Sequence, residues 1–172
     1  QSLLQQLVHQ PSPEVAPAKR RRRLTNLPAS LTSFVGRTQE VATVTQLIAN
    51  NRLVTLTGVG GVGKTRLALE VGKGILDSAS KQPTNPKSKI HNPKFPDGVW
   101  FVELAPLDGS EHELSLVAQT IARLLNCQEQ AGQTPLDVLE EYLADKQLLL
   151  VLDNCEHLVA TCAEVSERLL HR

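Results

Sequence analysis

The sequence predicts a single α/β domain built around a parallel sheet, and three observations support this fold class. Its 172 residues fit one hydrophobic core with a tail, because domains usually take about 100–200 residues. Short β-favouring runs alternate along the chain with apolar residues at helical spacing, which is the order of elements in a parallel sheet with helical connections. The run over residues 148–152 is apolar throughout, as expected of a strand that is covered on both faces.

The first half of the sequence predicts a helix, a strand and a second helix. Apolar residues recur at helical spacing over 41–48 and again over 67–75, which indicates one buried face on each helix. Residues 53–57 (LVTLT) lie between them and form a short β-favouring run. We therefore expect the first strand of the sheet at 53–57.

The second half repeats the pattern with clearer boundary signals. Ser110 and Glu113 have the spacing of a capping box before a helix, and Thr134 with Pro135 is typical of an N-cap followed by a first-turn proline. The predicted elements are a strand at 99–102, a helix over 114–124, a helix from Pro135 to Leu143, a strand at 148–152 and a closing helix over 158–169.

Two polar segments interrupt these elements. Residues 1–30 contain three early prolines and the basic run Lys19–Arg23 but little that could build a core, so we expect a disordered or linker segment. Residues 78–96 contain four prolines and no apolar period, which predicts a long surface loop. The folded part is therefore expected to cover 31–172.

Composition excludes several classes of protein. Lys and Arg together equal Asp and Glu, at 18 each, so the overall charge gives no reason to expect a nucleic-acid partner. The longest apolar run, at 148–152, is far shorter than the roughly 20 residues of a membrane span, so we expect no membrane contact and a cytoplasmic location. The three cysteines form no Cys-x-x-Cys pair, which favours reduced thiols. The chain contains no Met, so we expect it to be part of a longer protein.

The strongest motif in the sequence lies between the predicted strand at 53–57 and the helix that follows. Residues 58–65 (GVGGVGKT) fit the P-loop pattern G-x-x-x-x-G-K-[ST] in its proper strand-to-helix context. Glycines let successive backbone N–H groups turn towards clustered negative charge, and the helix N-terminus adds partial positive charge. Lys64 is expected to reach the β- and γ-phosphates of a nucleotide, and the Thr65 hydroxyl to bind Mg²⁺. The predicted nucleotide-binding residues here are Gly58, Val59, Gly60, Gly61, Val62, Gly63, Lys64, Thr65 and Arg66.

A second motif, which supplies a carboxylate, follows the predicted strand at 148–152. Asp153 comes directly after it, where a Walker B aspartate would complete the Mg²⁺ site, although an aspartate here could also cap a helix. The next residue, Asn154, cannot act as a carboxylate base. Glu156 is the nearest alternative for orienting the attacking water, and it also suits the first turn of the last helix. The predicted catalytic set is therefore Lys64, Asp153 and Glu156, with Thr65 and Asp153 as metal ligands.

Three segments together resemble bacterial STAND ATPases, which are NB-ARC-like signal-transduction ATPases of multidomain regulators. The segments are 34–40 (FVGRTQE), 56–65 (LTGVGGVGKT) and 150–158 (LVLDNCEHL), and the resemblance extends from about Asn26 to the end. It implies a P-loop NTPase fold with three α/β/α layers, of which this chain holds the N-terminal part. It also implies that Val35, Gly36 and Arg37 line the nucleotide near the adenine, with Thr38 replacing the usual Glu.

The resemblance also implies a function. Such proteins switch between states by exchanging ADP for ATP and by slow hydrolysis, so we expect an ATP-binding switch module that uses ATP or ADP with Mg²⁺. The guanine-reading pattern N-K-x-D is absent from these residues, which favours adenine. The expected partners are the upstream and downstream domains of the full-length protein and a second copy on activation, with DNA bound only through other domains.

In the resembling fold, the strand that carries the sensor arginine lies between the Walker A and Walker B strands, and the chain stops before it. We therefore expect an incomplete sheet whose two inner strand edges are either unpaired or paired with each other. Marginal folding and weak nucleotide binding by residues 1–172 are expected to follow.

Other functions stay open at this point. The five cations of Lys19–Arg23 could bind nucleic acid through counterion release, although no aromatic residues interleave with them for stacking. A metabolic kinase or a AAA+ machine would keep the P-loop, but the sequence shows no acceptor motif or arginine finger. A nucleotide-binding scaffold without turnover is compatible with Asn154.

Overall fold

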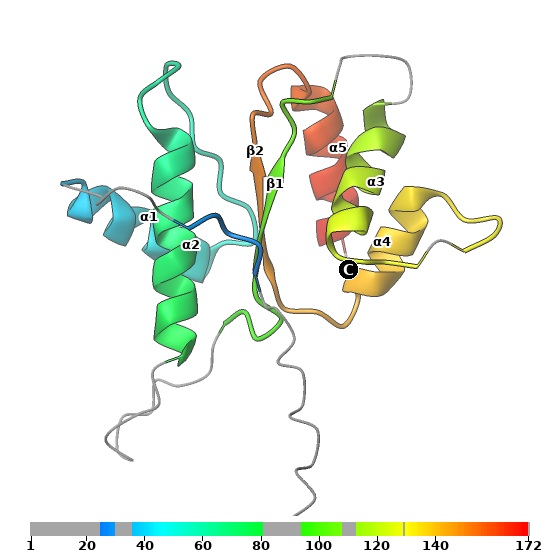
Figure 1. Ribbon diagram of the computed structural model, residues 1–172, viewed down its shortest axis with the longest axis horizontal. Helices are drawn as coiled ribbons and strands as arrows, with labels where there is room; N and C mark the ends of the chain where they lie inside the picture. The colour runs from blue at the N-terminus through cyan, green and yellow to red at the C-terminus, as the bar shows by residue number, and fades with distance from the viewer. Residues whose placement is uncertain (1–24, 30–35, 81–93, 108–112, 129, 172) are drawn as a thin grey trace, which may run out of the picture.

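The computed structural model describes residues 25–29, 36–80, 94–107, 113–128 and 130–171. Five helices and two strands lie within these ranges, in the order α1, α2, β1, α3, α4, β2, α5 (Figure 1). They are α1 (Thr38–Asn50), α2 (Lys64–Ser80), β1 (Val99–Glu103), α3 (Glu113–Leu124), α4 (Pro135–Leu143), β2 (Leu149–Asp153) and α5 (Val159–Leu170). Within the described residues, no helix is long and apolar enough to cross a membrane.

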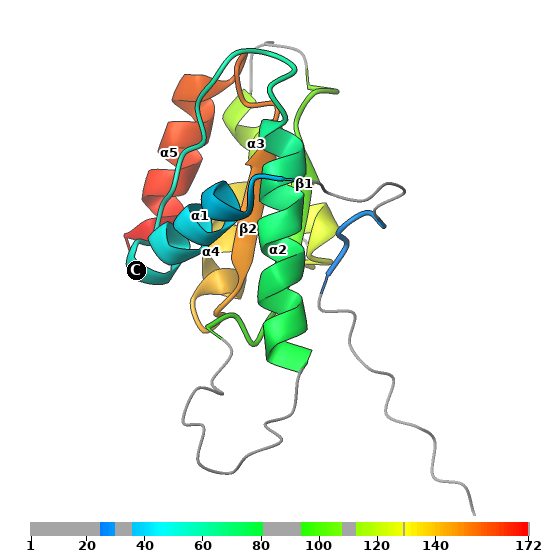
Figure 2. The same cartoon turned by 90° about the vertical axis from the view of Figure 1, so that its left-hand side faces the viewer.

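The two strands form a small parallel sheet. Val99 pairs with Leu149 at one end and Glu103 with Asp153 at the other, so both strands finish at the same edge. The helices lie on both sides of this sheet: α1 and α2 on one side, and α3, α4 and α5 on the other (Figures 1 and 2). The fold is therefore mixed α/β with a parallel sheet, as the alternating pattern predicts, and it is compatible with part of a P-loop fold.

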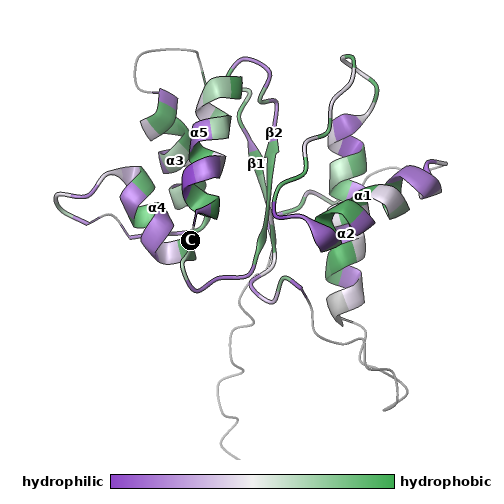
Figure 3. Cartoon of the chain, turned by 180° about the vertical axis from the view of Figure 1, so that it is seen from behind, coloured by the Kyte–Doolittle hydropathy of each residue, from purple (hydrophilic) through white to green (hydrophobic). Residues whose placement is uncertain are grey.

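The hydrophobic core lies between the sheet and the α3–α5 side. Both strands are hydrophobic along most of their length, and the helices carry hydrophobic and hydrophilic stretches (Figure 3). Each helix of this side contributes apolar residues at helical spacing, which is why the sequence pattern located them well. The core residues are Val102, Leu104, Val117, Ala118, Ile121, Leu125, Leu136, Leu139, Leu158, Cys162 and Val165.

Helix α4 begins where its boundary signals place it. The Thr134 hydroxyl accepts a hydrogen bond from the Asp137 N–H at 3.2 Å, and the Asp137 carboxylate accepts one from the Thr134 N–H at 3.1 Å. Pro135 occupies the first turn, where its missing N–H costs nothing. The capping box predicted at Ser110 and Glu113 is not tested, because Ser110 lies outside the described residues.

Residues 53–57 are not a strand, so the prediction of a first strand there is wrong. The described sheet consists of β1 and β2, and the segment pairs with neither of them. Leu53 is 58% exposed, and β2 is half-buried along its whole length rather than covered on both faces. An apolar run forms a strand only when a neighbour supplies hydrogen bonds. Of the two outcomes expected for an incomplete sheet, the unpaired one is observed.

The boundaries of the two polar segments also differ from the predicted ones. Residues 78–80 belong to α2, so the expected loop begins later than 78, and 81–93 lie outside the described residues. At the other boundary, Thr25 forms a parallel bridge with Val99. The side chain of Asn26 pairs with the Phe101 backbone, donating to its oxygen and accepting from its N–H, both at 2.7 Å. Residues 25 and 26, within the segment assigned to the linker, therefore contact the sheet.

Candidate functional site

The glycine-rich segment 58–63 forms a loop that leads directly into α2. Gly61 and Gly63 have φ values of 75° and 88°, which side-chain-bearing residues rarely adopt. Val59 is 77% exposed, and nothing lies within 4 Å of the position a Cβ would take on Gly60 or Gly61. The loop thus presents an open backbone surface at the N-terminus of α2, where the first N–H groups of the helix have no intrahelical partner.

Lys64 is the first residue of α2, and its side chain folds back over the loop. Its Nζ donates to the carbonyl oxygen of Gly58 at 2.9 Å and lies 3.4 Å from that of Val59. The same Nζ is 3.4 Å from Glu156 Oε1. The ammonium group is therefore held at the mouth of the loop by two carbonyls and a carboxylate, all of which a more highly charged anion could replace.

Thr65 and Asp153 meet although they are 88 positions apart in sequence. The Thr65 hydroxyl lies 3.0 Å from Oδ1 and 2.9 Å from Oδ2 of Asp153. Asp153 is the last residue of β2, so the strand delivers its carboxylate to the first turn of α2. A hydroxyl beside a carboxylate is a donor set that fits Mg²⁺, which usually takes one or two carboxylates and completes its shell with water and phosphate oxygens. Among the described residues there is no group of three or more His, Cys, Asp or Glu side chains that could hold a metal ion on its own.

The chain turns sharply after Asp153. Asn154 has a φ of 58°, in the left-handed region where Asn is among the few tolerated residues other than glycine. Glu156 follows two residues later. The pKa of its carboxyl is lowered, first by a backbone hydrogen bond and then by the Lys64 ammonium. Lys64, Asp153 and Glu156, the three predicted catalytic residues, therefore cluster at one edge of the sheet.

The segment before α1 supplies one more neighbour of the loop. Arg37 Nη1 donates to the carbonyl oxygen of Val62 at 2.8 Å, and Gly36 precedes it with a φ of 78°. Val35, the third residue predicted for this part of the site, lies outside the described residues. Arg66 is exposed on the first turn of α2.

Sequence reasoning missed two of these contacts. It did not foresee that Arg37 bonds the loop backbone or that Glu156 pairs with Lys64. The sequence gives a signal only for the sharp turn after Asp153. Asn154 stands there directly after the strand, and Asn tolerates the left-handed conformation.

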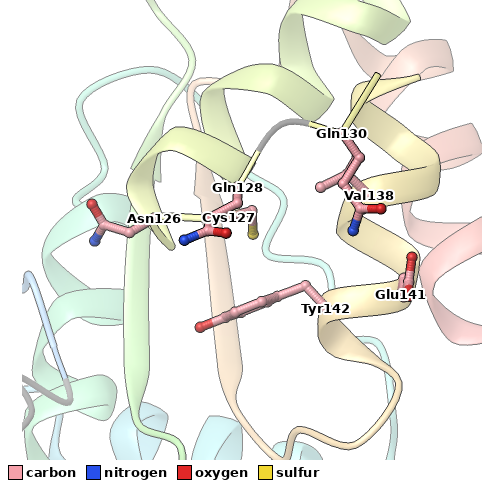
Figure 4. Close-up of a pocket in the computed structure, with 7 residues that line it drawn as sticks. All are labelled: Asn126, Cys127, Gln128, Gln130, Val138, Glu141 and Tyr142. Atoms are coloured by element: carbon pink, nitrogen blue, oxygen red, sulfur yellow. The ribbon is translucent and has the colours of Figure 1, made fainter. Parts of the chain in front are cut away.

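A cavity of about 360 Å³ lies elsewhere, between the end of α3 and α4 (Figure 4). It shares no residue with the loop or with the Thr65–Asp153 pair. Its lining residues are Asn126, Cys127, Gln128, Gln130, Val138, Glu141 and Tyr142.

Comparison with known proteins gives a family match over most of the chain. The family model described as Novel STAND NTPase 1 matches residues 27–171. The "Putative HTH-type transcriptional regulator Mb0914c" of Mycobacterium bovis is 41% identical over 124 residues, which are 72% of this chain and 12% of that protein. The "Regulatory protein AfsR" of Streptomyces griseus is 30% identical over 158 residues, covering 84% of this chain and 14% of the regulator. The chain therefore spans a small part of these relatives' length. No solved structure gives a significant match.

Proposed function

The chain belongs to the novel STAND NTPase family, and from this premise we propose that it is the ATP-binding switch module of a multidomain signalling or transcriptional regulator. The observation that carries the proposal is the meeting of Thr65 with Asp153 next to Lys64. A chance glycine-rich turn would have no reason to bring a hydroxyl and a strand-end carboxylate together across 88 positions.

In this proposal the loop Gly58–Gly63 and Lys64 hold the phosphates of ATP or ADP. The backbone N–H groups of the loop and of the first turn of α2 supply donors, and Lys64 supplies positive charge. Gly36, Arg37, Val35 and Arg66 complete the predicted nucleotide-binding set. Phosphate oxygens would take over the Lys64 ammonium from the carbonyls of Gly58 and Val59, because a charged acceptor binds an ammonium more strongly than a neutral one.

Thr65 and Asp153 are the proposed Mg²⁺ ligands. The bound metal ion would neutralise charge on the β- and γ-phosphates. The Thr65 hydroxyl, which now lies within hydrogen-bonding distance of the Asp153 carboxylate, would direct an oxygen lone pair to the metal instead. Asp153 supplies the full negative charge of the pair.

Hydrolysis is assigned to Glu156 as the group that orients the attacking water. Its exposed carboxylate has a lowered pKa, so it is ionised at neutral pH. The carboxylate lies 3.4 Å from the Lys64 ammonium, and it would become free to orient a water molecule once phosphate oxygens replace it at Lys64. The relatives named as regulators support placing the module in a larger cytoplasmic protein, where other domains contact DNA and where nucleotide exchange could drive self-association.

The test is a titration of a fluorescent ATP analogue into the chain, with and without Mg²⁺. We expect Lys64→Ala to weaken binding at least tenfold, because it removes the charge that faces the phosphates. The matched control is Lys146→Ala, since Lys146 precedes the amino end of β2, where it pairs with Asp145, whereas Lys64 lies near the carboxyl end. Equal binding by wild type and Lys64→Ala would show that the loop does not hold the nucleotide.

A nucleotide-binding scaffold without turnover is the second candidate, and Asn154 at the position after Asp153 favours it. Phosphate release by the full-length protein separates the two. An ATPase should lose most of its release rate in Glu156→Gln while it keeps nucleotide affinity, whereas a scaffold releases no phosphate in either form. Salt-sensitive DNA binding that disappears when residues 19–23 are neutralised would point instead to the basic segment, which lies outside the described residues.

A further inference from the structure

Arg37 stands at a position where local interactions disfavour an arginine. It is the N-cap residue of α1, and its side chain makes no capping hydrogen bond. Helix N-caps favour Ser, Thr, Asp and Asn, and a cation near a helix N-terminus opposes the helix dipole. Its φ of 58° is also in the left-handed region, which is uncommon for a residue of this size. The ion pair with Glu40, at 3.7 Å and exposed, offsets little of this cost.

The guanidinium makes its closest described contact with the phosphate-binding loop. Its Nη1 donates to the Val62 carbonyl oxygen at 2.8 Å. A Cβ built on Gly63 would lie 3.3 Å from the same Nη1. The guanidinium therefore packs directly against the peptide unit that joins Val62 to Gly63.

The Val62–Gly63 peptide unit carries the Val62 C=O and the Gly63 N–H. A contact that fixes the direction of the C=O also fixes the direction of the N–H. The described residues contain no cis peptide bond, and in a planar trans peptide the C=O and the N–H point in opposite directions. With the Val62 oxygen held by Arg37, the Gly63 N–H points away from the guanidinium. Gly63 directly precedes α2, and its own carbonyl accepts the Leu67 N–H at 3.0 Å, so its peptide lies at the helix N-terminus.

We propose that Arg37 is a positioning residue that fixes the Val62–Gly63 peptide and so aims the Gly63 N–H at a nucleotide phosphate. The proposal rests on the function given above, and it differs from the contact near the adenine that the family resemblance implies. Arg37 acts through the loop backbone and therefore serves any ligand that carries the phosphates, whether or not it carries a base.

The experiment compares Mg-ATP with Mg-tripolyphosphate, which lacks the nucleoside, by calorimetric titration of the chain. Arg37→Met keeps the length of the side chain but removes its donors and charge. We expect it to weaken binding of both ligands by the same factor of about ten, the loss of one charge-assisted hydrogen bond. Arg37→Lys, which retains a donor, should restore part of the loss. Arg123→Met, an exposed site in the last turn of α3, is the control and should bind within twofold of wild type.

A spectroscopic readout tests the same idea without a ligand. In the ligand-free chain, the Gly63 amide resonance should move in Arg37→Met but not in Arg123→Met, because only the former releases the Val62–Gly63 peptide.

Two results would overturn the proposal. A loss confined to ATP would assign Arg37 to the nucleoside, and an unmoved Gly63 resonance would show that the peptide is held by other contacts. Failure of the proposed function looks different: neither ligand then binds in a Lys64-dependent way, whatever the state of Arg37.

Discussion

The two sides of the sheet differ in how they use their side chains. On the α3–α5 side, apolar residues from three helices and both strands form one continuous core, with Ile121, Leu139 and Val165 fully buried. On the other side, α1 buries only Val44, the loop at 58–62 is exposed, and residues 53–57 pair with no described strand. The side with the densest packing is thus not the side that carries the candidate chemistry. This agrees with the general finding that ligand-binding segments come from the less stable parts of a fold.

The largest expected effect contrasts two helical leucines, one from each side. Leu139→Ala, in α4, should lower the free energy of unfolding by about 3 kcal/mol, because it leaves a cavity in a closed core. Leu47→Ala, in α1, should lower it by less than about 1 kcal/mol, since Leu47 is already 43% exposed. Urea denaturation followed by circular dichroism measures both. Equal losses would show that the two sides contribute alike to stability.

A smaller effect is expected from the helix starts. Thr134→Ala removes the capping box of α4 and should cost about 1 kcal/mol of unfolding free energy while nucleotide affinity stays unchanged. Thr134→Ser keeps the hydroxyl and serves as the control. Arg37, at the start of α1, is expected to behave in the opposite way, affecting ligand binding more than folding. A drop in affinity in Thr134→Ala would mean that the two sides are energetically coupled.

The smallest effect concerns Cys155, which lies between Asp153 and Glu156 and also packs against the core. Burial raises the pKa of its thiol to about 12. Because the folded state favours the neutral thiol, this contribution to stability is complete below the thiol's unfolded pKa, near 9, and is lost as the pH rises towards 12. At pH 9, iodoacetamide should therefore modify Cys155 more slowly in the folded chain than in urea, as followed by peptide mass spectrometry. Equal rates would place this turn outside the core.

The same comparison explains what the sequence could and could not predict. The α3–α5 side follows from local patterns, since Leu136 and Leu139 mark a buried face and Thr134 with Pro135 marks a boundary. Asp153 was also predictable, because it ends an apolar strand. The prediction of a strand at 53–57 was wrong because the pattern of residues indicates apolar character but does not show whether a neighbouring strand is present. The contact between Arg37 and the Val62 carbonyl could not be predicted, because every residue offers the same backbone acceptor and the sequence leaves no trace of which one is used.

The attachment of residues 25–26 to the outer edge of β1 has a mechanical consequence. The Thr25–Val99 bridge and the two hydrogen bonds between Asn26 and Phe101 fasten the chain to the sheet before it reaches Gly36. A pulling force on the preceding segment would therefore act first on β1, and through it on β2 and Asp153. The force would reach the loop at 58–63 only after the contacts of residues 25–26 with β1 had broken. A force on the N-terminal segment would thus reach the proposed metal ligand Asp153, through β1 and β2, before it reached the residues proposed to bind the phosphates.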